Sequence, residues 1–519
     1  MFGWFWREAE QLISRLPNTR NEVKIVAAFR MSRLDRALMG AAFLIAVLGF
    51  LSPDKIRVGG GFGWDGSLYG AWVKHFNFLV LERKADDYYV SKILPAAVIH
   101  YGMRLFGIPF TDENIICAFG VLNASLICVG AYVWLRIASH LKLTGQGKAL
   151  GFIGLFLNYA VIKAPSYYPV LNDTAGWFGG LLLVALYLTA RRWLMILALP
   201  FVAFTWPALL LEGALLLALP APAGAGAAQQ VPGVPWHGLL AGFAAVAVLI
   251  GILRCLREDN RLVTPMVYLG AVLCAAYVFM ALGGLWKWDQ LFRLRFWIGE
   301  FRVSILLALL AFIAVKVLVR MLTGAVSGLT VRTFLHQIAW TGTMQPGVFL
   351  VAHINFFGPL LLVALFRWND VCIAIRKLGA GFTAVASLAL LLSIDSESRH
   401  IVSFLPVLVI PVVCAAERNP WRWAHVALFG MLSVVFAKPW LIIGDNLQLY
   451  YLSQGPYMTV SDYRLYLLAL TLLSGITYWI LRQSPQAALS EAVPVQKAKV
   501  ERARQPKPRK KRRRTNNRN

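Results

Sequence analysis

Thirteen stretches of this chain are apolar on every side of a helix, and this feature restricts the fold more than any other. A stretch such as 37–50 (ALMGAAFLIAVLGF) has no polar face to turn toward water, so we expect it to cross a bilayer as a helix. Lipid offers the backbone no hydrogen-bond partners, and a helix satisfies these groups internally. The stretches lie near residues 37–52, 114–135, 149–163, 174–190, 194–219, 237–253, 262–284, 303–319, 347–366, 378–394, 401–416, 424–443 and 464–481.

The composition agrees with a membrane protein, since 58% of the 519 residues are hydrophobic and only 15% are charged. The sequence therefore predicts an all-α fold, a polytopic transmembrane helix bundle of about 12 to 14 membrane segments. The six cysteines are scattered through or beside apolar segments without C-x-x-C spacing, so we expect neither disulfides nor thiolate metal ligands.

Basic residues predict the orientation of the chain. Residues 497–519 contain twelve Lys or Arg and one Glu, a large part of the net charge of +26. Residues 1–36 are charged and precede the first apolar stretch, which reads as a signal anchor. We expect 1–36 to be a cytoplasmic amphipathic segment, 37–482 the membrane bundle, and 483–519 a disordered cytoplasmic tail. The tail should bind anionic lipid headgroups and, lacking interleaved aromatic residues, no nucleic acid.

Two cytoplasmic termini require an even number of crossings, and thirteen stretches give an odd one. Residues 196–220 carry Pro200 and Pro207, so we interpret this segment as a broken or re-entrant pair. An undetected extra element within 321–345 is the alternative. Four polar segments then lie on the outer side of the membrane, at 53–113, 164–173, 395–400 and 444–463.

The first outer loop, 53–113, has a high density of charged residues for so apolar a chain, among them Lys92. Its stretch DGSLYGAW predicts a short helix in which Tyr69 follows Asp65 by about one helical turn. Asp65 would stand near the start of that helix, where the helix dipole favours an ionised carboxylate. Two interpretations of Asp65 remain open at this point, a helix N-cap or a catalytic base.

Two further outer segments place polar residues next to apolar helices. Asn172 and Asp173 occur where the chain enters a span, and Glu397, Arg399 and His400 lie between two apolar stretches. Charges at such a position are unfavourable unless paired or functional. Arg399 either pairs with Glu397 or Asp395 as a lid on the bundle or, with His400, binds phosphate. Acidic residues and an Arg on one membrane face suggest one shared site.

Glu212 lies inside the broken segment, and two interpretations of it stay open: it approaches this site, or it bonds to backbone freed by Pro207. No paired His, H-E-x-x-H or acidic cage occurs, so a metal site built by the protein is not expected.

Three motifs resemble those of the C-type (GT-C) membrane glycosyltransferases, in particular the protein mannosyltransferase-like enzymes that use polyprenyl-phosphate sugars. FGWDGSLYGAW is similar to their W-D-G/A-x-x-Y signature in the first outer loop. YYPVLNDTAGWFGG resembles their second acidic motif, and ESRHIVSFLPVLVIP resembles their late E-x-R-Y/H motif followed by L-x-P. The sequence departs from several branches in lacking an acidic pair at the first motif and a large soluble C-terminal domain.

The resemblance implies that Asp65 is the general base, that Asp173 orients a substrate, and that Arg399 and His400 contact phosphate. We extend the expected substrate-binding set to Glu397, Tyr69, Lys92, Asn172 and Glu212.

The implied activity is inverting transfer of a sugar from a polyprenyl-phosphate donor to a hydroxyl of a glycan, lipid or protein acceptor. No cofactor is required, although a divalent cation (Mg or Mn) held by Asp65 and the donor phosphate is an open alternative. We expect a bacterial inner-membrane enzyme whose site faces the periplasm. A polytopic transporter or a lipid or glycan flippase is the alternative function, but its charges would be expected near the bilayer midplane on symmetric broken helices.

Overall fold

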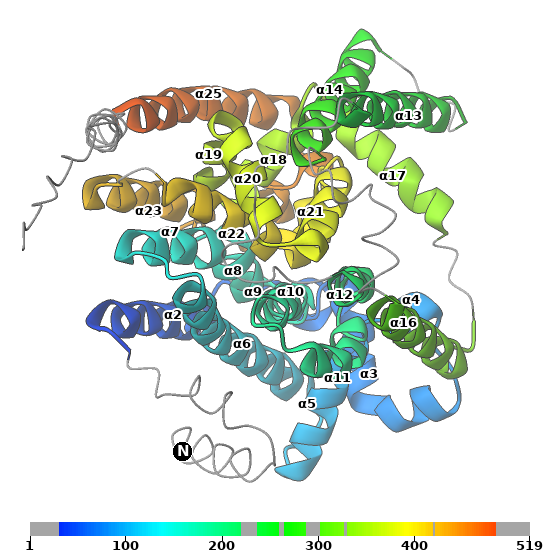
Figure 1. The fold of residues 1–519 in the computed structure, drawn as a ribbon. Coiled ribbons are helices and arrows are strands. Elements are labelled where there is room, and N and C mark those ends of the chain that lie inside the picture. Colours follow the sequence, from blue (N-terminus) through cyan, green and yellow to red (C-terminus); the bar gives the residue numbers. More distant parts are fainter. Residues whose placement is uncertain are drawn as a thin grey trace, which may run out of the picture.

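The computed structural model describes residues 31–219, 236–258, 264–286, 302–325, 330–418 and 421–483, and Figure 1 shows their arrangement. Throughout these ranges the regular structure is helical, apart from a single β-bridge between Asp86 and Ala325. The predicted all-α fold is therefore confirmed. Most of the predicted N-terminal segment, up to residue 30, and the predicted tail from residue 484 lie outside the described residues.

Each of the thirteen apolar stretches is helical, as predicted. Nine stretches form one helix, three form two, and the stretch 347–366 forms three. The helices are α2 (Arg33–Leu51), α6 (Asp112–His140), α7 (Gly145–Phe156), α8 (Tyr159–Ile162), α9 (Ala164–Tyr167), α10 (Asp173–Leu188), α11 (Arg192–Ala203), α12 (Pro207–Ala218), α13 (Trp236–Glu258), α14 (Pro265–Leu285), α16 (Arg302–Leu322), α18 (Val348–Phe357), η4 (Pro359–Leu361), α19 (Leu362–Phe366), α21 (Ala380–Leu392), η5 (Ser398–Phe404), α22 (Leu405–Ala416), α23 (Trp423–Ala437) and α25 (Val460–Gln483).

Within the described ranges, seven helices are long and apolar enough to cross a membrane, and the chain is therefore a membrane protein. They are α2, α6, α13, α14, α16, the continuous η5–α22 segment and α25. A bent pair, α7 followed by residues 159–167 at an angle of 62°, raises this number to eight if it forms one span. Six further apolar helices are shorter than a span: α10, α11, α12, α18, α21 and α23.

The predicted break within 196–220 occurs between α11 and α12. Pro200 stays inside α11, whereas Pro207 is the first residue of α12, where a missing N–H is tolerated. The Leu199 side chain packs against Gly213, so the chain folds back on itself at residues 204–206. The broken helix is present, but the break lies downstream of Pro200.

Helices also occur in regions where no span was predicted, and two of them lie between predicted spans in the second half of the chain. α17 (Val331–Thr343) occupies part of 321–345, where an extra element was the alternative explanation of the odd number of stretches. α20 (Trp368–Lys377) is amphipathic and lies in a predicted basic loop. The Trp368 indole N–H donates a hydrogen bond to the Met280 carbonyl, and the Arg376 guanidinium donates one to the Gly284 carbonyl. Both carbonyls lie near the end of α14.

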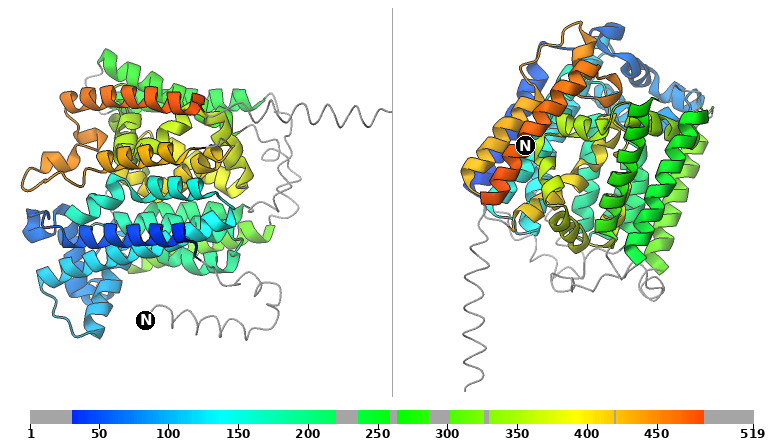
Figure 2. Two further views of the ribbon diagram at one scale, coloured as in Figure 1. Left: turned by 90° about the vertical axis from the view of Figure 1, so that its left-hand side faces the viewer. Right: turned by 90° about the horizontal axis from the view of Figure 1, so that it is seen from above.

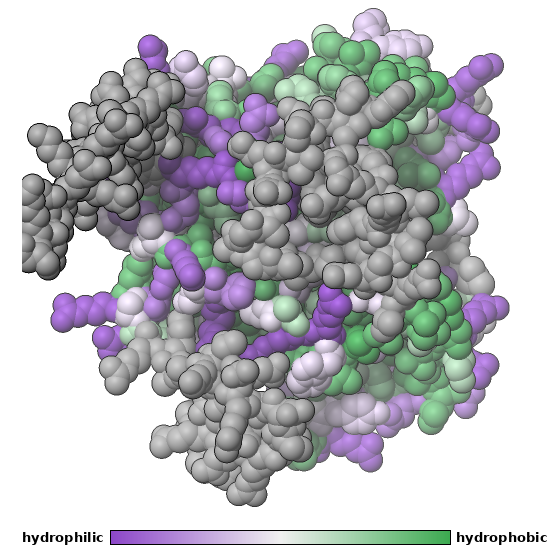
Figure 3. Space-filling model, viewed as in Figure 1, coloured by the Kyte–Doolittle hydropathy of each residue, from purple (hydrophilic) through white to green (hydrophobic). Residues whose placement is uncertain are grey.

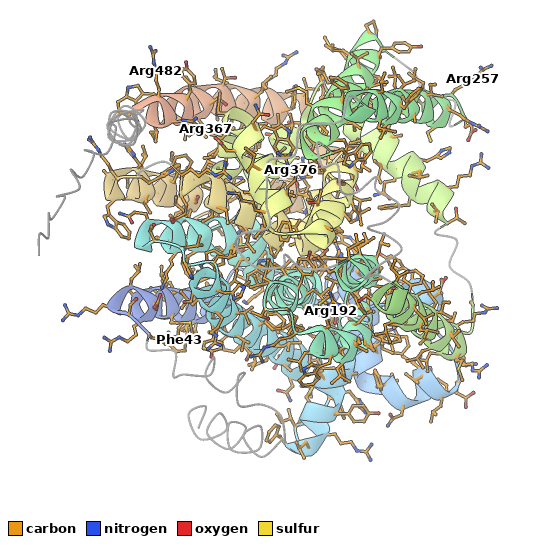
Figure 4. The ribbon with its side chains drawn as sticks, in the orientation of Figure 1. Phe43, Arg192, Arg257, Arg367, Arg376 and Arg482 are labelled. Carbon is orange, nitrogen blue, oxygen red and sulfur yellow. The ribbon has the colours of Figure 1, made fainter. Side chains whose placement is uncertain are left out.

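Polar segments gather at the two ends of the bundle. Figure 2 shows residues 53–113 together with residues 438–459 at one end, which we call the site end, and the last turns of α25 at the opposite end. Contacts near that opposite end join α2 to α7, α11 to α16, α19 to α25 and α22 to α20. They involve Lys148, Arg192, Arg367 and Arg418, and we call this the basic end. Figure 4 labels Arg192, Arg367, Arg376 and Arg482 there.

Arg254 is an exception to the concentration of basic residues at the basic end. The C-terminal end of α14 lies at the basic end. The junction between the antiparallel helices α13 and α14 therefore lies at the site end. Arg254 and Arg332 both pair with Glu258 at the end of α13. Basic loop residues therefore occur at both ends, and their distribution indicates orientation less sharply than the sequence suggested.

The outer helices present apolar side chains to the surroundings. Figure 3 shows apolar surface over α13 and α14 at the top and over α16 at the lower right. Exposed side chains there include Phe243, Ile250, Leu309 and Ile313. In water such a surface would be strongly unfavourable, whereas lipid chains solvate it without penalty.

α10 and η5 approach each other closely at one glycine. A Cβ atom added to Gly180 would lie 1.9 Å from the carbonyl oxygen of Ser403, so no larger residue fits without moving one of the two backbones. This contact fixes the position of the 398–404 turn relative to the start of α10. Both segments carry predicted site residues.

We expect Gly180→Ala to destabilise the protein by about 1–3 kcal/mol, because the methyl group collides with backbone rather than with a movable side chain. Gly242→Ala in α13 is the matched control, since nothing lies within 4 Å of its added Cβ. That variant should change stability by less than about 1 kcal/mol. Thermal unfolding of both proteins in detergent checks the difference, and equal midpoints would contradict the close approach.

Candidate functional site

The first polar loop folds into four short elements that place Asp65 at the site end. These are η2 (Val58–Gly61), α3 (Trp64–Leu81), α4 (Asp87–Val90) and α5 (Leu94–Leu105). Gly63 is the N-cap of α3 with φ 69°, and a Cβ there would lie 2.2 Å from the Tyr168 ring. The N-cap interpretation of Asp65 is therefore wrong, because Asp65 is the second residue of the helix. Its carboxylate still lies in the first turn, where the helix dipole stabilises negative charge.

Arg399 lies among three carboxylates that come from separate parts of the sequence. Its Nη2 is 3.7 Å from Asp65 Oδ2, and its Nε is 3.6 Å from Asp173 Oδ2 and 4.0 Å from Glu397 Oε1. The Arg399 side chain is only 15% exposed. The three predicted motifs thus meet at one guanidinium. We call the four residues Asp65, Asp173, Glu397 and Arg399 the Arg399 cluster.

The members of the cluster differ in their access to solvent. The Asp65 side chain is 39% exposed, whereas those of Asp173 and Glu397 are each 8% exposed. Asp65 is therefore the carboxylate that an incoming molecule reaches most easily.

Among the residues that the structure describes, several polar atoms in and beside the cluster have no hydrogen-bond partner. They are Arg399 Nε, Asp173 Oδ1 and Asn172 Oδ1, all of them buried. Arg399 Nε has only the ion pairs already described, at 3.6 and 4.0 Å, beyond hydrogen-bond distance. Buried polar atoms are normally satisfied, so this concentration marks the place where a water molecule or a polar ligand can form further hydrogen bonds.

His400 belongs to a neighbouring pair that the sequence did not resolve. Its Nδ1 is 2.7 Å from Asp395 Oδ2, and its Nε2 is 3.6 Å from Glu397 Oε1. Asp395 also accepts hydrogen bonds from the Thr341 hydroxyl and the Glu397 N–H. Burial tends to raise the pKa of Asp395, but the His400 contact and these hydrogen bonds hold that pKa below its usual value. Of the two partners considered for Arg399, the structure pairs it with Glu397 and reserves Asp395 for His400.

Lys92 lies beside the cluster, in the turn between α4 and α5. Its Nζ donates to the Tyr88 hydroxyl at 2.5 Å and lies 5.1 Å from the centre of the Trp206 ring. The Asn172 side-chain N–H donates to the Lys92 carbonyl at 2.9 Å, which joins this turn to the start of α10. Burial, followed by repulsion from Arg399, lowers the pKa of Lys92 to about 8.

Tyr69 is buried beneath Asp65, one turn further along α3, with its ring edge-on to Tyr89. Burial raises the pKa of its hydroxyl well above the usual range, and the negative charge of Asp65 acts in the same direction. The phenol therefore stays protonated and is available as a hydrogen-bond donor.

Glu212 is not brought into the cluster. Its side chain is fully buried in α12, and neither carboxyl oxygen has a hydrogen-bond partner in the described part of the chain. The residue of this broken segment that reaches the site is Trp206, at the turn between α11 and α12, and the neighbouring Phe204 carbonyl accepts from the Leu94 N–H at 2.9 Å. Substrate binding by Glu212 stays a prediction without a contact to support it.

Apart from Tyr69, sequence reasoning missed the aromatic residues around the cluster. Tyr168 is uncharged and therefore did not stand out in the sequence. Its hydroxyl accepts a hydrogen bond from the Gly66 N–H at 3.0 Å. Tyr450 packs on Tyr168 with ring centres 6.2 Å apart. The only sequence signal for Tyr450 was the placement of 444–463 on the same predicted membrane face.

Asp54 joins the first polar segment to the fourth and to Lys163, the residue directly before the second. Its carboxylate pairs with Lys163 at 2.7 Å and accepts the N–H groups of Ile443 and Gly444, each at 2.9 Å. Burial tends to raise the pKa of Asp54, but these hydrogen bonds and Lys163 hold it below the usual value. The segment that continues to Tyr450 is thereby anchored to the first polar loop.

Asp54→Ala should destabilise the protein by about 3–5 kcal/mol, because it leaves the buried Lys163 ammonium without a counter-charge. Asp445→Ala is the matched control, since Asp445 pairs with Arg57 in an exposed position, and it should cost less than about 1 kcal/mol. Thermal unfolding and amide hydrogen exchange at residues 443–446 measure the effect. Equal unfolding midpoints and unchanged exchange would refute the anchoring role.

No family model, curated protein or solved structure matches this chain. Within the described ranges, no three His, Cys, Asp or Glu side chains are grouped as metal ligands would be. The functional assignment therefore depends on the residues themselves.

Proposed function

We propose that this protein is an integral membrane glycosyltransferase that transfers a sugar from a polyprenyl-phosphate donor to an acceptor hydroxyl, with inversion at the anomeric carbon. The observation that carries the proposal is the meeting of Asp65, Asp173 and Glu397 at Arg399. A carboxylate base beside a cation that receives phosphate is what this transfer requires. A donor held in the bilayer needs no nucleotide-binding domain.

Asp65 is the base in this proposal because it is the most exposed carboxylate of the cluster. It takes the proton from the acceptor hydroxyl, whose oxygen attacks the anomeric carbon as the bond to the phosphate oxygen breaks. The proton remains on Asp65 and the electron pair leaves with the lipid phosphate. Asp173, with its unpartnered Oδ1, accepts a hydrogen bond from a sugar hydroxyl and thereby orients it.

Arg399, Lys92 and His400 supply the positive charge for the donor phosphate. Arg399 Nε lacks a hydrogen-bond partner, so the guanidinium has a donor to offer an oxyanion. Three carboxylates surround this one guanidinium, and further cations are needed before a phosphate can be accommodated. Lys92 and His400 lie close enough to contribute that charge, and Tyr69 adds a neutral donor.

The proposal includes an orientation and a membrane count. The site end faces the periplasm of a bacterial inner membrane, and both termini are cytoplasmic, on the side of the basic end. The fold then contains about 12 to 14 membrane segments, which requires that the shorter apolar helices also enter the bilayer. Support comes from the basic residues that join helix ends opposite the site.

Asp65→Asn should lower the transfer rate by about 10²–10⁴-fold, because the amide cannot accept the acceptor proton. Asp112→Asn is the matched control, an exposed carboxylate paired with Lys74 in the same polar region. The rate is measured with purified protein and a polyprenyl-phosphate sugar, and folding is compared by thermal unfolding. Full transfer by correctly folded Asp65→Asn would eliminate Asp65 as the base.

Donor binding should weaken as the pH rises through about 8. Since the pKa of Lys92 lies near 8, below its usual value, its side chain is a cation below that pH and neutral above it. In Lys92→Arg the charge persists, so affinity for a polyprenyl phosphate should stay constant up to about pH 10. Binding is measured to protein in nanodiscs from pH 7 to 10. Identical pH profiles for the two proteins would exclude Lys92 as a phosphate contact.

A further inference from the structure

Three aromatic rings pack against one another at the site end. The Trp64 and Tyr451 ring centres are 5.6 Å apart at an interplanar angle of 40°, and those of Tyr451 and Tyr457 are 4.4 Å apart at 39°. Trp64 comes from the start of α3, and both tyrosines come from the polar segment before α25. We call Trp64, Tyr451 and Tyr457 the aromatic platform.

The platform is accessible and adjoins the proposed base. Trp64 is 43% exposed and Tyr457 is 44% exposed. Trp64 directly precedes Asp65 in the sequence, and both lie in the first turn of α3. Tyr457 also interacts electrostatically with Glu397, Arg399 and Asp65, so the platform lies close to the Arg399 cluster.

A buried amide without partners lies in the same segment. Both polar atoms of the Gln454 side chain lack hydrogen bonds, although Gln454 is only 1% exposed. The backbone around it is fixed, since the Gly455 N–H donates to the Ser396 carbonyl at 3.0 Å. An amide offers one acceptor oxygen and two N–H donors. A hydroxyl group can bond to either, because it both donates and accepts hydrogen bonds.

The arrangement differs from a membrane-interface belt. Belt residues anchor a protein individually through exposed indole or phenol rings. Trp440 fits that description, since it is exposed and lies outside the platform. The platform rings instead pack on one another, and Trp64 also contacts Tyr168, with ring centres 6.4 Å apart. A rigid, uncharged row of rings is suited to an extended ligand with flat apolar faces and polar edges.

We propose that the aromatic platform binds the acceptor, and that the acceptor is a neutral glycan of more than one sugar ring. The C–H faces of the sugars stack on the aromatic platform at its exposed rings, Trp64 and Tyr457, and the sugar hydroxyl groups remain free to bond to neighbouring polar side chains. The reacting hydroxyl is thereby presented to Asp65. This inference rests on the proposed function and restricts its acceptor to carbohydrate instead of a protein or lipid hydroxyl.

The test measures glycan binding separately from sugar transfer. Protein in nanodiscs is titrated with neutral oligosaccharides of several sugars released from a bacterial cell envelope, and binding is followed by saturation-transfer NMR. We expect Trp64→Ala and Tyr457→Ala each to raise the dissociation constant about tenfold, the effect of losing one aromatic contact. Trp440→Ala, the matched control, should bind like the unaltered protein, and Trp64→Phe should retain most of the affinity.

Transfer kinetics then separate the two proposals. For Trp64→Ala we expect a higher KM for the acceptor, with kcat and the donor KM nearly unchanged. Loss of glycan binding in Trp64→Ala together with full transfer by Asp65→Asn would refute the catalytic assignment and leave the platform intact. Glycan binding that is absent, or equal in Trp64→Ala, Tyr457→Ala and Trp440→Ala, would overturn the platform. If these variants only lowered the stability of the protein in the bilayer and left glycan binding unchanged, the rings would be interface anchors and the platform proposal would also be wrong.

Discussion

The contact of one buried guanidinium with three carboxylates is the interaction on which the site depends. A charge in a low-dielectric interior is tolerated only when opposite charges surround it. Asp65 comes from the first polar loop, Asp173 from the start of α10, and Glu397 from the turn before η5. Arg399 therefore connects segments that are far apart in the sequence. Because the carboxylates outnumber this cation, the arrangement also requires Lys92 and His400 nearby before it can accept an anion.

The membrane helices were predictable because their signal is local. An apolar stretch without a polar face indicates a helix whatever its neighbours are, and all thirteen stretches are helical. Helix ends depend on tertiary contacts and were less predictable. Pro200 remains within α11, and the break at 204–206 is fixed by contacts that the sequence does not display, such as the Leu94 N–H to the Phe204 carbonyl. The start of α3 was misplaced because Gly63, which packs on Tyr168, is the cap.

The charged part of the site was predictable, and the aromatic part was not. In so apolar a chain an Asp or Arg stands out, and lipid makes an unpaired charge unfavourable, so Asp65, Asp173 and Arg399 could be singled out. Tyr and Trp are common in any membrane protein, so nothing distinguished Tyr451 from an interface residue. Its position follows from the Asp54 anchor and from the bond between Gly455 and Ser396, which no local pattern encodes.

The unpartnered polar atoms offer the polar contacts that the proposed substrates need. Each buried polar atom without a hydrogen bond is unfavourable by about 1–3 kcal/mol, and Asn172 Oδ1, Asp173 Oδ1, Arg399 Nε and both amide atoms of Gln454 are in this state. A site with these side chains would be more stable if the polar atoms were paired with one another. Under the proposed function, the hydroxyl groups and the phosphate of the substrates supply the missing partners and favour binding of ligands that carry both.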